Sequence, residues 1–174
     1  MNEALKNLFE RRSCRAYRDE QVKEEELNAV LEAGTYAPTA MGRQSPIIVS
    51  VSDKATMKRV ERLNAGVKGD PDAPAFYGAP NLVVVFADTE TPFGTADANL
   101  VIGNILNAAN AIGVDSCYIW RAKEAFESED GRALKKEWGI PDSYEGAGNV
   151  ILGYGLPEGK RAPLPRKKDY IRKF

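Results

Sequence analysis

The sequence predicts a single α+β domain in which helices pack on one sheet. Three observations favour this fold class. With 43% hydrophobic and 28% charged residues, the 174-residue chain has an ordinary globular composition and is long enough to bury a core. Segments with helical spacing are interleaved with short apolar runs, but not in a regular β-α-β order. No repeat or linker divides the chain, so we predict one domain over residues 1–174.

The N-terminal part of the chain predicts two helices and a loop. Apolar side chains at helical spacing indicate a first helix around residues 5–9. A second helix is predicted over about Lys23–Tyr36, because acidic residues fill its first turn and complement the helix dipole. A proline ends this helix, and the loop Pro38–Pro46 follows.

Two strands and one helix are predicted in the middle of the chain. Ile47–Val51 is short and rich in β-branched residues, which indicates a strand. Asp53 caps a charged helix that runs to about Leu63, and Asn64–Ala79 is a loop rich in Gly, Pro and Ala. Leu82–Phe86 is continuously apolar, as expected of a strand that is covered on both faces.

The most unusual predicted helix covers Ala96–Ile112. It is almost uncharged and apolar nearly all round, so it must be buried on all sides. In a domain of this size, packing against a partner subunit is the simplest way to bury it. Its asparagines are interpreted as hydrogen-bonded packing residues rather than as ligands.

The last part of the chain predicts a strand, a helix, a strand and a tail. The three elements are Ser116–Trp120, Ala122–Trp138 and Val150–Tyr154. The tail, about residues 155–174, is rich in Pro, Lys and Arg and too poor in apolar residues to pack alone. We expect it to form a basic C-terminal arm.

Charge and hydropathy exclude several classes of partner. The net charge of −1 gives no general attraction to nucleic acid or to an anionic membrane. The N-terminus has no apolar signal segment. The longest uncharged stretch, Ala98–Val114, is short for a membrane span and carries several asparagines. We therefore expect a soluble cytoplasmic protein.

The chain contains no histidine, which limits the chemistry that its own side chains can perform. Ser-His-Asp and Cys-His catalysis and histidine-ligated metal sites are excluded, and no metal site is predicted. Cys14 and Cys117 are far apart in sequence and form no C-x-x-C motif. Cys117, in an apolar strand, is interpreted as a buried inert thiol. An enzyme with this composition would rely on a bound cofactor.

Two basic clusters are candidates for holding a phosphate. Arg11, Arg12 and Arg15 surround Ser13 at a helix end, and guanidinium groups pair well with phosphate oxygens. Taken alone, these residues favour the alternative of a solvated helix terminus stabilised by the helix dipole. The second cluster, Arg166–Lys168, would act with the first only if the fold brought the two together.

The loop Ala37–Gln44 is a candidate for contact with a flat ring. Its small residues and exposed backbone allow close approach, although a simple helix-ending connection has the same composition. No G-x-G-x-x-G follows a strand and no G-K-[ST] occurs. Rossmann and P-loop phosphate binding are therefore not indicated.

Five segments, in order along the chain, resemble motifs of the FMN-dependent nitroreductase family. Glu10–Tyr17 resembles the opening R-R-S-x-R-x-[FY], and Ala37–Ala40 resembles the A-P-[ST]-[AG] loop. Tyr77–Pro80 is similar to the Y-x-A-P that precedes an apolar strand. Gly113–Ala122 resembles the G-x-x-S-C-W-I-x-R-A of the small-chain branch, and Ile151–Tyr154 resembles the closing L-G-Y.

The resemblance implies a fold, an assembly and a reaction. The expected fold is an α+β sandwich with a central mixed or antiparallel sheet flanked by helices. The expected assembly is a homodimer with FMN at the subunit interface. The expected reaction is ping-pong: a hydride passes from NADH or NADPH through the flavin to a small electrophilic acceptor such as a nitroaromatic or quinone. No protein acid or base is required.

The resemblance also assigns the FMN contacts in three groups. The group that would hold the phosphate and the pyrimidine edge contains Arg11, the backbone at Arg12, Ser13 and Arg15, with Arg166 and Lys168 from the tail. The group that would approach the ring from the other subunit contains Pro38, Thr39, Ala40 and Met41. In the third group, Asn64 would meet the polar edge of the ring, and Trp120 and Arg121 lie where the family places backbone around the reactive nitrogen of the flavin.

Departures from the family's motifs leave the substrate open. The N-x-Q-P-W that often follows the A-P loop reads Gly42–Ile47 here and lacks the tryptophan, and Tyr118 and Trp120 replace the W and H of the branch motif. Reductive dehalogenation, flavin fragmentation and reduction of an activated alkene are alternative activities. A non-catalytic module that binds flavin or a phosphorylated metabolite is another. Nucleic-acid binding has little support, because the basic residues are not interleaved with aromatic ones.

Overall fold

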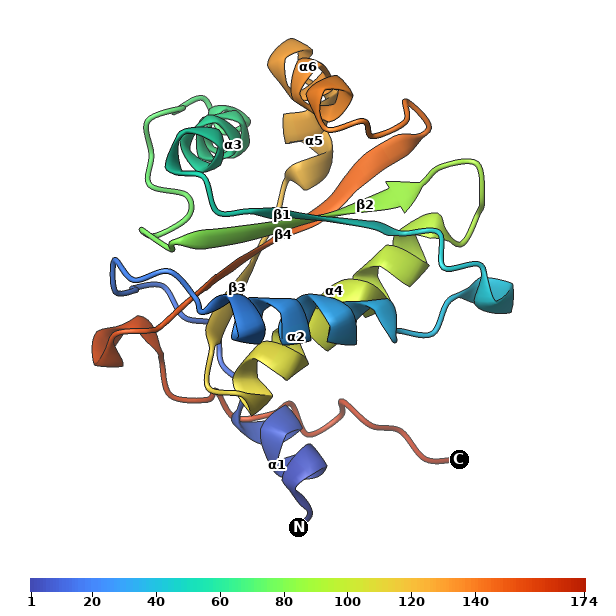
Figure 1. Ribbon diagram of the computed structural model, residues 1–174. Coiled ribbons are helices and arrows are strands. Elements are labelled where there is room, and N and C mark those ends of the chain that lie inside the picture. The colour runs from blue at the N-terminus through green and yellow to red at the C-terminus, as the bar shows by residue number, and fades with distance from the viewer.

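The computed structural model describes residues 1–174 and contains one four-stranded sheet between two layers of helices (Figure 1). The strands lie in the order β1-β2-β4-β3, and every neighbouring pair is antiparallel. Their bounds are β1 Ile47–Val51, β2 Asn81–Asp88, β3 Asp115–Ile119 and β4 Tyr144–Gly153. The predicted α+β class is confirmed, and the sheet is antiparallel throughout.

Six helices cover the two faces of the sheet. In Figure 1, α3, α5 and α6 lie above the sheet, and α2, α4 and α1 lie below it. Their bounds are α1 Glu3–Glu10, α2 Glu24–Thr35, α3 Lys54–Gly66, α4 Gly94–Ala111, α5 Ala122–Glu127 and α6 Glu129–Glu137. No helix in the structure has both the length and the apolar character needed to cross a membrane.

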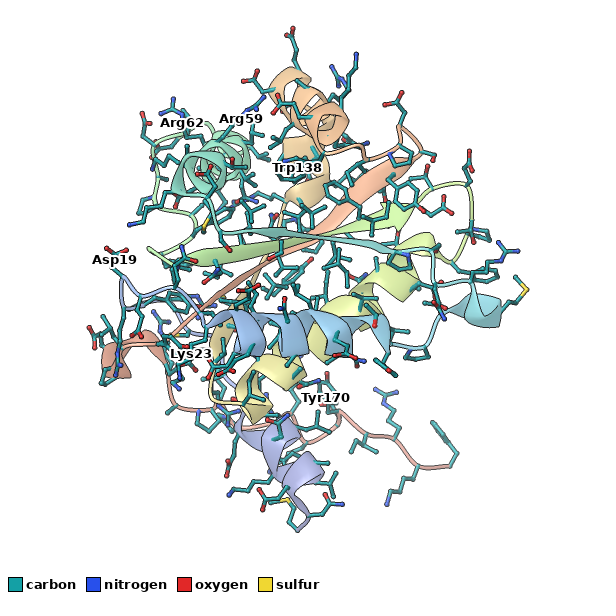
Figure 2. All side chains as sticks on the ribbon, viewed as in Figure 1. Asp19, Lys23, Arg59, Arg62, Trp138 and Tyr170 are labelled. Carbon is teal, nitrogen blue, oxygen red and sulfur yellow. The ribbon has the colours of Figure 1, made fainter.

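The core has two halves that meet at the sheet. Side chains of β2 alternate between them: Leu82, Val84 and Phe86 pack with α3, α5 and α6, whereas Val83 and Val85 pack with α2 and α4. The prediction that this strand is covered on both faces is therefore confirmed. Figure 2 labels Trp138 in the upper layer, where its ring lies 6.4 Å from that of Phe86.

Several predicted elements are confirmed with small changes of length. β1 has the predicted bounds, and the second helix differs by one residue at each end. Asp53 caps α3 as expected, because its carboxylate accepts a hydrogen bond from the backbone N of Thr56 at 2.7 Å. However, α3 continues to Gly66, so Asn64 lies in the helix and not in the predicted loop.

The predicted helix Ala122–Trp138 is wrong, because two short helices occupy this range. Ser128 has extended backbone angles, φ −65° and ψ 162°, and separates α5 from α6. Its hydroxyl donates to the carbonyl of Ala125 at 2.6 Å and accepts from the backbone N of Gly131 at 3.0 Å. The serine thus acts as the N-cap of α6.

The last strand is longer than the sequence predicts. It starts at Tyr144 rather than Val150, and β2 and β3 pair with it on either side. Glycines at positions 146 and 148 weaken the strand signal in the sequence, since glycine has low strand propensity. Pairing on both edges supplies the stability that local propensity does not.

The central helix α4 is buried only on one side within a single chain. Val101, Ile102 and Ile105 are almost fully buried, but Leu100 is 49% exposed. Helix α1 contributes no buried residue at all. Residues 161–174 of the tail are all exposed. The sequence predicts that this helix is buried on all sides. A single chain leaves one side of α4 exposed.

Candidate functional site

The basic N-terminal segment is fixed between β3 and the chain near Gly159. The backbone N of Cys14 donates to the carbonyl of Ser116 at 2.9 Å, and the backbone N of Arg15 donates to the carbonyl of Gly159 at 2.9 Å. Isolated β-bridges pair Ser13 with Ser116 and Cys14 with Lys160. The segment thus prolongs the sheet beyond its β3 edge.

The side chains of residues 11–15 alternate between the core and the outside of the domain. In extended backbone, successive side chains point to opposite sides. Cys14 is fully buried, so Ser13 and Arg15 point away from the core, and Arg11 follows the same alternation. Neither Arg11 nor Arg15 belongs to any of the eight ion pairs of the chain. Two cationic donors and one hydroxyl therefore share one side of a fixed segment.

Arg12 has a different role from its two neighbouring arginines. Its Nη1 donates to the carbonyls of Phe9 and Arg11, each at 2.7 Å, at the C-terminal end of α1. The helix-terminus interpretation therefore holds for this side chain. The family resemblance assigns only the backbone of this residue to the ligand.

Neutral buried groups anchor the segment to the core. The hydroxyl of Tyr17 donates to the carbonyl of Cys14 at 2.8 Å. Burial raises the pKa of Tyr17 far above its ordinary value, and it also raises the pKa of the Cys14 thiol. Cys14 is therefore a packing thiol and not a nucleophile at neutral pH. Cys117 is also buried, as predicted.

The start of the C-terminal tail is tied to the first residue of β3. The carboxylate of Asp115 accepts from the Nζ of Lys160 at 2.8 Å and from the backbone N of Gly155 at 3.1 Å. Residues 155–160 therefore belong to the body of the domain, and the free arm starts near residue 161.

The loop after α2 is held in place by a residue that the sequence did not single out. The backbone N of Ala40 donates to both carboxylate oxygens of Asp97, at 3.1 and 3.2 Å. Asp97 is 4% exposed and lies in the first turn of α4. The sequence does contain one indication of its importance, since Asp97 is the sole charged residue of α4.

The same loop has a constrained backbone. Met41 and Gln44 adopt left-handed conformations, with φ of 55° and 51°. The backbone N of Gln44 donates to the Oγ1 of Thr39 at 3.0 Å. Pro38 and Met41 are exposed, whereas Thr39 and Ala40 are partly buried. The loop is therefore a defined projection and not a simple connection.

One chain does not bring this loop next to the basic segment. In Figure 1, the short helical turn at Ala40–Gly42 lies at the right end of the molecule, far from α1 and the segment that follows it. A site that uses both parts needs the loop of a second chain, which stays a prediction.

Three of the predicted cofactor contacts meet at the end of β3. The Nδ2 of Asn64 donates to the carbonyl of Trp120 at 2.6 Å, and the Nη2 of Arg121 donates to the Oδ1 of Asn64 at 3.3 Å. Asn64 is fully buried, and Arg121 has a left-handed backbone with φ 77° and ψ 20°. Trp120 is 68% exposed. We call these three residues the β3-end cluster.

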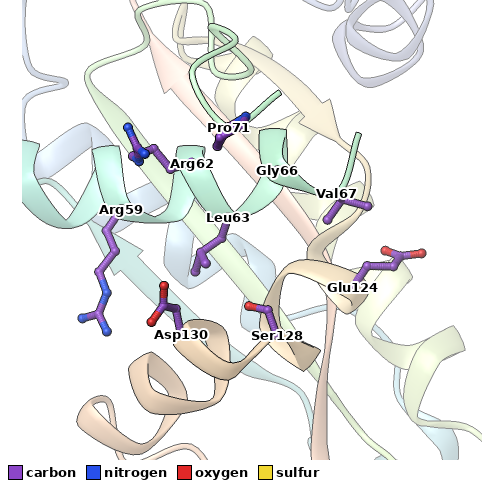
Figure 3. Close-up of a pocket in the computed structure, with 9 residues that line it drawn as sticks. All are labelled: Arg59, Arg62, Leu63, Gly66, Val67, Pro71, Glu124, Ser128 and Asp130. Atoms are coloured by element: carbon purple, nitrogen blue, oxygen red, sulfur yellow. The ribbon is translucent and has the colours of Figure 1, made fainter. Parts of the chain in front are cut away.

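A groove of about 540 Å³ adjoins this cluster, between α3 and the helices α5 and α6 (Figure 3). Its two arginines are neutralised by carboxylates: Arg59 pairs with Glu137 at 2.8 Å, and Arg62 pairs with Asp72 at 2.6 Å. Further carboxylates, Glu124 and Asp130, line the same groove. The groove therefore offers no free positive charge for an anionic ligand.

The tail places one of its predicted contacts beside the first basic cluster. Arg166 and Arg12 line the same groove of about 710 Å³, together with Leu8, Phe9 and the residues Pro163–Pro165. Lys168 lies further along the exposed tail and does not line this groove. The structure thus brings one residue of each basic cluster together.

Known proteins resemble this chain in sequence and in structure over most or all of its length. A model of the nitroreductase family matches residues 8–154. A nitroreductase from Bacteroides fragilis, solved with bound FMN, superposes with a TM-score of 0.92 at 26% identity, covering 100% of both chains. One from Desulfitobacterium hafniense, also with bound FMN, gives a TM-score of 0.88 at 30% identity, covering 100% of this chain and 99% of the other. An Archaeoglobus fulgidus protein, named as a candidate NADH dehydrogenase/NAD(P)H nitroreductase, is 31% identical over 91% of this chain and 88% of its own length.

Proposed function

The chain belongs to the nitroreductase family, and on this basis we propose that it uses bound FMN to move a hydride from NADH or NADPH to a small electrophile. The acceptor class that we propose is nitroaromatics and quinones, which are flat and electron-poor. Two relatives solved with FMN over the whole length of this chain support the cofactor assignment.

The observation that carries the proposal is the outward side of residues 11–15. It presents Arg11, Ser13 and Arg15 from a backbone that β3 holds rigidly, and no carboxylate of the chain pairs with either arginine. Unpaired guanidinium groups beside a hydroxyl suit a phosphate group. The donor set therefore fits the phosphate end of FMN.

The other end of the cofactor would meet the β3-end cluster. The Nε of Arg121 is buried and has no hydrogen-bond partner within the chain. Buried donors are rarely left unpaired in proteins, so such an atom suggests a missing acceptor. The flavin ring offers carbonyl and nitrogen acceptors along its polar edge. Asn64, Trp120 and Arg121 would thus orient that edge.

When bound, FMN supplies hydride acceptance and donation, which no side chain of this histidine-free chain offers. The protein contributes position and charge. Arg11, Ser13 and Arg15 would hold the phosphate, with Arg166 and Lys168 of the tail as further cationic partners. Fixed donors near the ring would stabilise negative charge that develops there.

We propose that the functional unit is a homodimer. Helix α1 buries no residue within the chain, and Leu8 and Phe9 are 53% and 60% exposed. Leu100 of α4 and Ile112 at the C-terminal end of this helix are 49% and 42% exposed. A partner chain covering these residues would also bring Pro38, Thr39, Ala40 and Met41 to the flavin, and the arm beyond residue 160 would lie across that partner.

The visible spectrum of the purified protein, recorded before and after anaerobic addition of NADH or NADPH, tests the central proposal. We expect a yellow protein that bleaches and that recovers its colour with nitroaromatics or quinones. A protein that stays colourless after incubation with FMN would overturn cofactor binding. A bleached protein that none of these acceptors reoxidises would overturn only the acceptor class.

A further inference from the structure

Arg121 combines a strained backbone with a long side chain. Its φ of 77° belongs to the left-handed region, which glycine occupies without penalty and which other L-residues occupy rarely. Non-glycine residues in this region cluster at functional sites, where the surroundings hold them in place. If residue 121 only had to form the turn from β3 to α5, glycine would be favoured at this position. The arginine side chain therefore has a use of its own.

The side chain leads back to Asn64. The Nη2 of Arg121 donates to the Oδ1 of Asn64, and the Nδ2 of that asparagine donates to the carbonyl of Trp120. Together these two bonds fix the orientation of the buried Asn64 amide. One hydrogen on its Nδ2 remains free for a further acceptor, because an amide carries two.

The charge of Arg121 is not neutralised within the chain. It belongs to none of the eight ion pairs, and its Nε is buried without a partner. Glu124, one turn further along α5, forms no ion pair with it either. In the adjoining groove, by contrast, Arg59 and Arg62 are both paired with carboxylates. Arg121 is therefore the free cation of this region.

We propose that Arg121 is a positioning residue whose side chain sets the reduction potential of the bound flavin in two ways. It orients Asn64, and it places a fixed positive charge beside the polar edge of the ring. Reduction by a hydride adds two electrons and one proton to the neutral ring, so the ring gains one negative charge. A neighbouring guanidinium binds that reduced form more tightly than the oxidised form. This inference rests on the proposed FMN binding.

The test is the midpoint potential of bound FMN in the wild type, Arg121→Gln, Arg121→Gly and Arg121→Lys. We expect the glutamine and glycine variants to lose about tenfold in preference for the reduced flavin, which makes the two-electron potential about 30 mV more negative. The lysine variant keeps the charge and is expected to lie closer to the wild type. The glycine variant also relieves the backbone, so it remains folded if glutamine is not tolerated.

One control variant tests whether the loss of any positive charge changes the potential. Lys136→Gln removes one positive charge from the exposed surface of α6 and is expected to leave the potential unchanged. A wild-type protein that binds no FMN would overturn the proposed function itself. A yellow wild type whose potential does not move in the glutamine and glycine variants would overturn the role of Arg121 alone. Equal shifts in the lysine and glutamine variants would overturn the charge effect.

Discussion

The outward side chains of residues 11–15 are free to bind because backbone contacts hold this segment. Arg15 is exposed, while its backbone N donates to Gly159. Ser13 is held by its bridge to Ser116. Replacing an outward side chain in this segment therefore removes a ligand contact and leaves the fold intact. Replacing either of the two buried anchors, Cys14 and Tyr17, is instead expected to disturb the fold.

Arg15→Ala is expected to weaken FMN binding and to spare the chemistry. A charge-assisted hydrogen bond contributes roughly 1.5–3 kcal/mol. The Kd for FMN should therefore rise about 10- to 150-fold. Fluorescence titration of the apoprotein with FMN measures this change, and Arg18→Ala, another exposed arginine of the same stretch, is the control. A collapse of turnover with unchanged affinity would contradict the assigned role.

Stability is expected to fall in alkaline solution because of Cys14 and Tyr17. Burial raises the pKa of both groups above their ordinary values of 9.0 and 10.0. Above those values the unfolded chain loses protons that the folded chain retains, so the free energy of unfolding decreases as the pH rises. Each group adds a slope of up to about 1.4 kcal/mol per pH unit.

Urea unfolding between about pH 7 and about pH 11 measures this loss. The Cys14→Ala variant is expected to lack the part of the decline that begins near the ordinary cysteine pKa of 9.0. A free energy of unfolding that is constant across the range, or a variant with the same decline as the wild type, would contradict the prediction.

Helix breaks and close contacts between elements position the β3-end cluster. Arg121 is the N-cap of α5, and α6 follows after the break at Ser128. The break folds α6 back on α5 so tightly that Gly131 has no room for a side chain. A Cβ at that position would lie 2.1 Å from the carbonyl oxygen of Ala125 and 2.6 Å from the Cα of Phe126. Glycine is required at position 131 because the backbone of α5 lies too close for a side chain.

Gly131→Ala is expected to lower the free energy of unfolding by about 1–3 kcal/mol, because the added methyl forces backbone to move. Gly66→Ala, in α3, is the matched control. Its Cβ would meet only the Cβ of Pro71, at an ordinary distance of 3.7 Å. Its stability should change by less than about 1 kcal/mol. Equal effects of the two substitutions in chemical denaturation would show that the close contact does not constrain α6.

The shape of a single chain keeps two predicted parts of the site apart and leaves apolar side chains exposed. The loop with Met41 and the segment with Arg15 lie in different parts of the chain (Figure 1). Leu8 and Phe9 of α1 and Leu100 of α4 are exposed apolar residues that a monomer would leave in water. The exposed arm carries further large apolar residues, including Leu164, Ile171 and Phe174. Dimer formation would resolve all three features together.

Leu8→Glu is expected to produce a monomer that retains little FMN, because a charge would enter the proposed interface. Sedimentation equilibrium should give the wild type twice the chain mass of 19.1 kDa and the variant the single mass. Circular dichroism should be unchanged, since Leu8 is already 53% exposed in the chain. Val67→Glu, an exposed apolar position on the other side of the sheet, is the control. A monomeric wild type, or a variant that still dimerises, would contradict the proposed assembly.

Local patterns in the sequence were enough to predict most elements and much of the candidate site. The bounds of β1, the cap at Asp53 and the doubly covered β2 follow from propensity, capping and hydrophobic runs, which act over a few residues. The phosphate-binding candidates Arg11, Ser13 and Arg15 were found in the same way, because their motif is contiguous.

Features that depend on residues far apart in the chain were not predictable from these patterns. The strand order, the early start of β4 and the break at Ser128 all depend on packing between elements. The bond from Ala40 to Asp97 spans 57 residues, and the bond from Asn64 to Trp120 spans 56. Periodicity describes which face of an element is apolar, but not which distant element covers it. The residues that could contact a phosphate were therefore visible in the sequence. The family resemblance also named Asn64, Trp120 and Arg121, but the hydrogen bonds that join these three residues became visible only when α3 and β3 were packed together.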